Sequence, residues 1–332
     1  MRLRLFRRRT ILCPTWTGLL GVSSILFIVV AAWFNYGETY LAVTNRVHAD
    51  ILVAMQDSLK LSTQVFLRRL GLYQRVKSSF LYDLYWSAAD PKIVSDRRRE
   101  VQFYRNTLTG FRKGGLIFDI GANQGHKTDI FLRLGARVVA VEPDPSNQKI
   151  LKQNFLEYRL KRKPVTIIGK AVSDRSGKTI FLIDEPGSAK NTLCQKWADS
   201  LRTDPSRFGR KLAFAEQREV ETITLEELIQ LFGMPYYVKI DVEGHEVHVI
   251  EGMRSPVPLL SFEVNLPEFA AEAEKCIGIL DELAPGGDFN QTADCSHGFL
   301  FEEWQTRDTA LEMLKSSDKT CIEVFWRAPG FR

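Results

Sequence analysis

The amino-acid sequence predicts an α/β protein in which helices cover both faces of a mostly parallel sheet, preceded by one transmembrane helix. Two observations support this. From Gly114 onward, strand-like and helix-like segments alternate, and a glycine-rich turn separates the first pair. Near the start of the chain, residues 16–34 form an apolar run of about the length that crosses a bilayer as a helix.

The charges divide the chain into a basic leader and a balanced body. The 332 residues hold 45 Lys and Arg against 40 Asp and Glu, and the first ten residues hold five arginines and no acid. The body therefore carries no excess of positive charge, which argues against a nucleic-acid partner. The five cysteines lie far apart without a CxxC pair, which excludes a zinc ribbon and a dense disulfide framework.

The first segments are predicted to be a basic leader, 1–15, and a single transmembrane helix, 16–36. Trp16 and Trp33 lie near the two ends of the apolar run, where aromatic rings favour the membrane interfaces. A cleaved signal peptide stays open as the alternative. However, the apolar run is longer than the apolar region of a usual signal peptide, and it ends in bulky residues instead of a small-residue cleavage site. By the positive-inside rule the arginines place the N-terminus in the cytoplasm.

The leader also resembles a known anchor region. RRRTILCPTW and YLAVTNRVHADILV are similar to the anchor segment of YdcF-like membrane proteins, over about the first 53 residues. This resemblance implies a fused or exchanged leader and carries no information on catalysis. We expect residues 37–110 to form a helical connector, and residues 111–332 to form the main domain.

The main domain is predicted from its alternating segments. Parallel strands bind ligands beyond their carboxyl ends, and residues 181–214 are expected to form a hairpin or lid there. The last two strands are expected to be antiparallel and to close the sheet. The predicted strands are LIFDIG (116–121), RVVAVEP (137–143), VTIIGKAVS (165–173), YYVKID (236–241), LLSFEVN (259–265), HGFLFEEW (297–304) and CIEVFWRAP (321–329).

Two acids and a glycine-rich turn point to the class of ligand. Asp119 and Glu142 end the first two strands, and the turn from Gly121 to Gly125 lets a ligand approach the backbone at a helix N-terminus. Glu142 is placed to accept hydrogen bonds from a ribose diol. Nicotinamide enzymes use the same device, but with GxGxxG and a bound pyrophosphate. Asp119 would repel a pyrophosphate, which favours S-adenosylmethionine.

Four blocks then carry a family resemblance. FDIGANQGHKT, VVAVEPDP, YYVKIDVEGHEVHVIEGM and PLLSFEVN resemble the FkbM family of S-adenosylmethionine-dependent methyltransferases, over roughly residues 80–270 and less clearly to 330. The resemblance implies a Rossmann-like class I methyltransferase fold. It also implies that the methionine end of the cofactor meets Asp119, Gly121, Asn123 and Gly125, the ribose Glu142, the adenine Ser173 or its neighbours, and the sulfonium Asp241. The alternative is that Asp119 and Asp241 only cap helices.

The catalytic residues are less determined by the pattern. A hydroxyl acceptor is a poor nucleophile and calls for a general base or a metal ion. Four residues near the strand ends are candidates: Asp241, Glu243, His245 and Glu263. Glu243 lies two residues beyond a strand end, which leaves its direction undetermined. Asp241, His245 and Glu263 are therefore the candidate catalytic residues, since His245 has an ordinary pKa near neutrality and the family resemblance places an acid at Glu263. A divalent ion held by Asp241, Glu243 and His245 is the alternative. We favour catalysis without a metal.

The expected activity follows from the resemblance. It implies O-methylation of a hydroxyl on a glycan, a lipid-linked sugar or a secondary metabolite. A nicotinamide-dependent oxidoreductase and a non-catalytic membrane-anchored scaffold are the rival interpretations. A cytosolic cofactor conflicts with a domain on the far side of the membrane, so the side that the domain faces stays open.

Overall fold

The computed structural model describes residues 91–156 and 165–331. These residues fall within one of the two compact units into which the chain divides, 66–332. Within the described ranges, no helix has the length and apolar character needed to cross a membrane. The predicted leader, transmembrane helix, YdcF-like segment and most of the connector lie outside the described residues, so they stay predictions.

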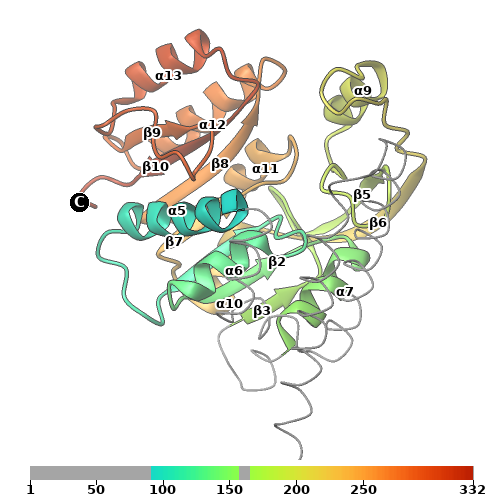
Figure 1. Cartoon of the computed structure of the whole chain (residues 1–332), viewed down its shortest axis with the longest axis horizontal. Coiled ribbons are helices and arrows are strands. Elements are labelled where there is room, and N and C mark those ends of the chain that lie inside the picture. Colours follow the sequence, from blue (N-terminus) through green and yellow to red (C-terminus); the bar gives the residue numbers. More distant parts are fainter. Residues whose placement is uncertain (1–90, 157–164, 332) are drawn as a thin grey trace, which may run out of the picture. The chain divides into compact units, whose positions relative to one another are not determined.

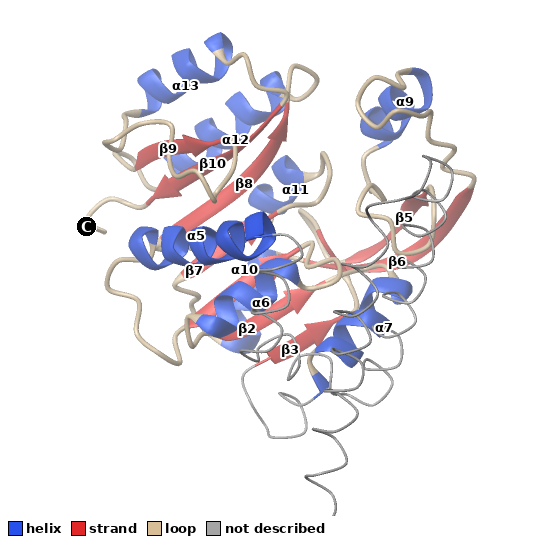
Figure 2. Ribbon diagram, in the orientation of Figure 1, coloured by secondary structure: helices blue, strands red, loops and turns tan. Residues whose placement is uncertain are grey.

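A seven-stranded sheet forms the centre of the domain (Figures 1 and 2). Its strand order is β3-β2-β1-β7-β8-β10-β9. All adjacent pairs are parallel except those of β10, which runs antiparallel to both of its neighbours. The predicted mostly parallel sheet with an antiparallel C-terminal strand is therefore confirmed. Its strands are β1 (Leu116–Ile120), β2 (Arg137–Val141), β3 (Val165–Ile168), β7 (Tyr237–Ile240), β8 (Leu259–Asn265), β9 (Asp288–Thr292) and β10 (Cys321–Arg327).

Helices cover both faces of this sheet (Figure 2). Two separate apolar clusters lie on either side of the strands, each formed by a different group of helices. One cluster holds side chains of α5 (Pro91–Thr107), α6 (His126–Arg133) and α7 (Pro145–Asn154). The other cluster holds side chains of α10 (Leu225–Phe232), α11 (Glu246–Glu251), α12 (Ala270–Leu283) and α13 (Arg307–Ser316).

Strand β1 shows why the sequence folds in this way. All five of its residues are buried, which is the pattern of a strand covered on both faces. Ile117 belongs to the cluster under α5 and α6, whereas Phe118 and Ile120 belong to the opposite cluster, because successive side chains alternate between faces. Asp119 is the polar exception at the carboxyl end of the strand, and it is only 1% exposed.

The predicted strand 165–173 is wrong in extent. It divides into β3, which ends at Ile168, and β4 (Ala171–Val172), which leaves the main sheet and pairs with β6 (Glu216–Ile223). β4, β6 and β5 (Gly177–Ile183) form a separate three-stranded sheet. A pattern of apolar residues cannot reveal this change of partner, because both halves of the segment are half-buried or buried strands.

The predicted lid is built on this small sheet. β5 and β6 are antiparallel, and the chain between them carries α9 (Gln195–Thr203). This connection docks on the junction of β8 and α12: Lys196 Nζ donates to the Glu268 carbonyl at 2.7 Å, and the Trp197 ring packs edge-on against Phe269. We call residues 184–215 the α9 arm. Figure 1 shows α9 at the far end of this arm from β5 and β6.

The predicted strand HGFLFEEW, 297–304, is also wrong. The structure assigns no strand to these residues, and the edge strand is β9 instead. Phe299 and Trp304 pack from a loop against the cluster under α5, so their apolar character serves packing rather than strand pairing.

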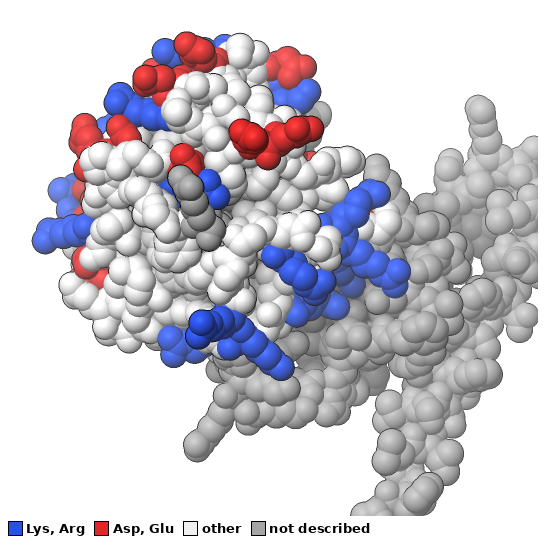
Figure 3. All heavy atoms as spheres, turned by 90° about the vertical axis from the view of Figure 1, so that its left-hand side faces the viewer, with Lys and Arg blue, Asp and Glu red and all other residues white. Residues whose placement is uncertain are grey.

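On the face seen in Figure 3, acidic and basic side chains are interspersed in the upper part, while Lys and Arg predominate below.

Candidate active site

The carboxyl ends of β1 and β7 approach each other closely at Gly121. This residue has a φ of 80°, and a Cβ there would overlap the carbonyl oxygen of Asp241. Only glycine fits both the backbone conformation and the space. Gly125 has a different role: a Cβ there would press on Leu151 and Phe155 of the α7 segment, and Gly125 lines neither of the cavities described below.

Glu142 connects the glycine-rich turn to the end of β2. Its Oε2 accepts the backbone N–H of Asn123, and its Oε1 accepts that of Asp144, each at 2.8 Å. Burial raises the pKa of Glu142 to about 7, against the two backbone hydrogen bonds, which lower it. Each carboxylate oxygen keeps a second lone pair, so Glu142 can still accept hydroxyl groups of a ligand.

A cavity of about 140 Å³ opens beside Glu142, and Asn147, Val172 and Glu263 also line it. Two polar atoms in its wall are buried without a hydrogen-bond partner among the described residues: Asn123 Oδ1 and Asn147 Oδ1. Unpaired buried acceptors are rare in folded proteins. An adenosine group would supply hydroxyl and amine donors at this place, so these residues fit the predicted cofactor. We call this space the adenosine cavity.

Ser173 does not line the adenosine cavity, although its neighbours do. Lys170, Ala171 and Val172 form the wall at this end. The Ser173 hydroxyl instead donates to Asp174 at 3.0 Å and lies 3.0 Å from His245 Nε2. The sequence predicted that Ser173 or its neighbours meet the adenine. The neighbours lie where this prediction needs them, and Ser173 does not.

A second cavity, of about 380 Å³, shares Gly121, Asn123 and Asp241 with the first. Asp119 and Lys239 line it, and the two residues are opposite each other on β1 and β7. The carboxylate of Asp119 accepts the Thr128 hydroxyl at 2.5 Å, and burial raises the pKa of Asp119. We call this space the methionine cavity, after the cofactor end that the sequence predicts near Asp119.

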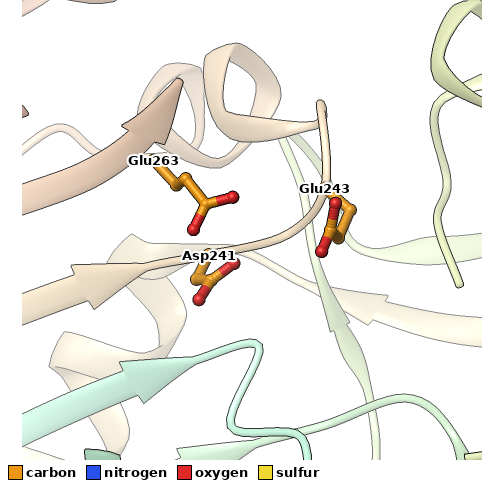
Figure 4. A group of neighbouring side chains, drawn as sticks. All are labelled: Asp241, Glu243 and Glu263. Carbon is orange, nitrogen blue, oxygen red and sulfur yellow. The ribbon is translucent and has the colours of Figure 1, made fainter. Parts of the chain in front are cut away.

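Three carboxylates gather in the wall of the adenosine cavity (Figure 4), and one of them, Asp241, also lines the methionine cavity. Asp241 follows β7, Glu243 lies in the next turn, and Glu263 is on β8; one oxygen of each lies within 4.8 Å of the others. We call these three residues the acid group. Burial and the neighbouring Asp241 raise the pKa of Glu263, and burial and Glu263 raise that of Glu243. Carboxylates this close cannot all ionise easily.

Contacts to the surrounding chain hold the acid group in place. Lys239 Nζ donates to Asp241 at 2.8 Å, and Trp197 Nε1 of α9 donates to Glu243 at 3.0 Å. Glu243 has a φ of 56°, and its turn is fixed by Glu246, whose Oε1 accepts the backbone N–H groups of Val242 and Gly244. The α9 arm thus contributes directly to the position of Glu243.

His245, a predicted catalytic residue, is not brought into the site. It precedes α11 and lines neither cavity. Burial and the nearby His248 lower the pKa of His245 to about 4, so the imidazole is neutral at physiological pH. Glu243 takes its place beside Asp241 and Glu263. Sequence reasoning gave Glu243 no firm direction, because its backbone turn depends on the left-handed φ.

The sequence prediction missed two further site residues, and only one of them has a signal in the sequence. Lys239 is a charged residue inside an otherwise apolar strand, and its side chain is 2% exposed. Such a position is costly without a partner or a ligand. Asn147 lies in the first half of α7 and is buried; nothing in the local pattern separates it from an exposed helical asparagine.

Residues 119–299, more than half of the chain, match the methyltransferase FkbM domain. The hexuronic acid methyltransferase AglP of Haloferax volcanii is 27% identical over 175 residues, which cover 52% of this chain and 63% of that protein. The chain thus spans less than two thirds of the length of this curated relative.

Solved structures of methyltransferases are similar at much lower identity. A precorrin-6Y C5,15-methyltransferase of Geobacter metallireducens is 10% identical with a TM-score of 0.34, covering 70% of this chain and 87% of that one. A SAM-dependent O-methyltransferase of Thermotoga maritima is 12% identical with a TM-score of 0.33, covering 70% and 66%. The match of residues 119–299 alone shows that the chain belongs to the FkbM family of methyltransferases, and its cofactor is S-adenosylmethionine.

Proposed function

We propose that this methyltransferase transfers the methyl group to a hydroxyl of a sugar-containing acceptor. The observation that carries the proposal is the acid group, which lines the adenosine cavity and reaches the methionine cavity through Asp241. A sugar hydroxyl has to lose a proton as it attacks, and a carboxylate at the reacting centre can accept that proton. The similarity to a hexuronic acid methyltransferase supports a glycan acceptor.

The cofactor supplies a methyl group already activated on a positively charged sulfur. The protein therefore has to hold both partners in line and remove the proton of the acceptor. Glu142 and Asn147 are positioned to bind the adenosine part. Asp241 lines both cavities, which supports a role for its carboxylate beside the sulfonium.

Glu263 is the general base in this proposal. It is the member of the acid group that lies on a strand of the main sheet, and it lines the adenosine cavity. Its raised pKa makes it a stronger base than an ordinary glutamate. His245 has no proton-transfer role here, because it lines neither cavity and its lowered pKa makes it a weak base.

Metal assistance is the second candidate mechanism, and the acid group is the observation that favours it. Asp241, Glu243 and Glu263 offer three oxygen ligands within 4.8 Å of one another, which is the chemistry that magnesium and calcium prefer. We retain the mechanism without a metal as the proposal. Unchanged activity after exhaustive treatment with EDTA supports this mechanism. A loss of activity that added magnesium restores would replace it with the metal mechanism.

The function is tested by offering the protein radiolabelled S-adenosylmethionine with two matched sets of oligosaccharides, one ending in hexuronic acids and one in the neutral hexoses. Methyl transfer to either set, located on oxygen by NMR of the product, supports the proposal. Transfer confined to amines or to non-sugar acceptors would overturn it. Glu263→Gln should lower the rate of transfer strongly, and Glu302→Gln, which changes an exposed loop residue, is the matched control.

A further inference from the structure

Two lysines line the methionine cavity, and the proposed mechanism gives neither a role in proton transfer. Lys239 lies on β7 and Lys127 in the first turn of α6. Their side chains are 2% and 24% exposed. Burying an ammonium group is costly unless an anion pairs with it. Where the carboxylates of the protein leave N–H donors of these lysines unused, the cavity can bind an anionic group of a ligand.

The partners that the described residues provide do not use all of the donors. Each ammonium group has three N–H donors. Lys239 makes one hydrogen bond, to Asp241 at 2.8 Å, and Lys127 makes one, to Glu100. Both lysines therefore keep donor capacity in the wall of the cavity.

The cation of Lys127 is held in place from α5. Burial alone would raise the pKa of Glu100. Hydrogen bonds and charges of His126 and Lys127 outweigh this effect and lower the pKa of Glu100 to about 2. Glu100 is thus a carboxylate at any ordinary pH, and it fixes Lys127 beside the glycine-rich turn. Lys239 is fixed in the same way by Asp241, and nearby acids raise its pKa against the effect of burial.

We propose that Lys127 and Lys239 bind the α-carboxylate of the methionine part of the cofactor, while Asp119 receives its α-ammonium group. The inference rests on S-adenosylmethionine as the cofactor and on the adenosine part lying beside Glu142. With the adenosine placed there, the amino-acid end reaches the adjoining cavity through the shared wall of Gly121, Asn123 and Asp241.

The charges in the two cavities agree with this direction of binding. The amino-acid end carries one positive and one negative group, and the methionine cavity offers Asp119 together with the two lysines. The adenosine cavity has one lysine in its wall, Lys170, which pairs with Glu221 at 2.9 Å and is 39% exposed. Of the two cavities, only the methionine cavity is thus lined by a pair of lysines, one buried and one half-buried.

The test compares two ligands that differ in the amino-acid part. S-adenosylhomocysteine carries it, whereas 5′-methylthioadenosine keeps the adenosine and the thioether and lacks it. Calorimetric titration of both ligands into the full-length protein, Lys127→Met and Lys239→Met gives four ratios of affinity between variant and wild type. We expect each substitution to weaken S-adenosylhomocysteine by about 10- to 100-fold, as for a charged hydrogen bond, and to leave methylthioadenosine unchanged.

Lys178→Met removes an exposed lysine that pairs with Glu219 on the small sheet and should change neither affinity. Because Lys239→Met leaves Asp241 without its cation and can unfold the protein, Lys127→Met is the decisive variant. An equal loss for both ligands would show that the lysines only support the fold and would overturn the proposal. The same holds if both affinities stay unchanged while the KM of an anionic acceptor rises, since the lysines would then serve the carboxylate of the acceptor. If the wild type binds neither ligand, the cofactor assignment fails as well.

Discussion

Two carboxylate sites at the strand ends, one buried and one half-buried, are held in contrasting ways. Glu142 is fixed by two backbone N–H groups, whereas the acid group is held by donors on side chains, and its carboxylates repel one another. Backbone donors stay in place when a ligand enters, which suits a binding site. Carboxylates that repel each other take up a proton readily, which suits proton transfer. The contrast assigns binding to the end of β2 and chemistry to the ends of β7 and β8.

The strongest test of this contrast is Glu263→Gln. We expect kcat to fall by about 10²- to 10⁴-fold, the usual contribution of a general base, and the affinity for S-adenosylhomocysteine to stay within error. Steady-state kinetics and calorimetry on the same preparation measure the two quantities. A comparable loss of cofactor affinity would place Glu263 among the binding residues and remove the distinction.

Glu142→Ala should mainly affect the affinity for the cofactor, unlike Glu263→Gln, which should mainly affect kcat. Loss of the acceptor for the ribose hydroxyls is expected to weaken cofactor binding by about 2–3 kcal/mol. Because the ribose belongs to both ligands, S-adenosylhomocysteine and methylthioadenosine should weaken equally, unlike in the lysine variants. A loss confined to S-adenosylhomocysteine would move Glu142 to the methionine end.

The pH dependence of kcat tests the proton-transfer role without changing the acid group. The base form of Glu263 is populated above its pKa, which is raised. The rate should therefore increase as the pH rises through the neutral to alkaline range, by up to about tenfold per pH unit below that pKa. A profile that is flat in this range, with chemistry shown to be rate-limiting, contradicts the assignment of Glu263.

The smallest effect is expected for His245→Gln. Its hydrogen bond to Ser173 is worth about 0.5–1.5 kcal/mol of the free energy of unfolding, while kcat should remain near that of the wild type. Urea denaturation and the transfer assay measure the two quantities. A large loss of kcat in a stably folded variant would restore His245 to the catalytic residues.

The sequence predicted the site best where a residue follows an apolar strand. Asp119, Glu142 and Asp241 lie at strand ends, and parallel strands bring such ends together. The prediction failed where polar side chains are buried for local reasons. Strand β9 is buried although it reads DFNQT, because Asn290 and Thr292 bind backbone carbonyls of the following loop. Apolar patterning cannot find such a strand, and it placed one at 297–304 instead.

His245 and the acid group show a second limit. The direction of a side chain in a turn depends on backbone angles, and Glu243 enters the acid group through a φ of 56°. Its turn is also set by Glu246 and by Trp197 of the distant α9 arm. Contacts between segments far apart in the chain decide these positions, so local spacing favoured the neighbouring histidine.

The contact at Gly121 has a consequence for how such a protein can diversify. No side chain fits between the ends of β1 and β7, so a mutation at this seam damages both cavities at once. The α9 arm is different, since it reaches the acid group through the hydrogen bond from Trp197 to Glu243 and lies outside the main sheet. An evolving lineage would therefore exchange its acceptors by altering the arm, while the seam stays closed to substitution.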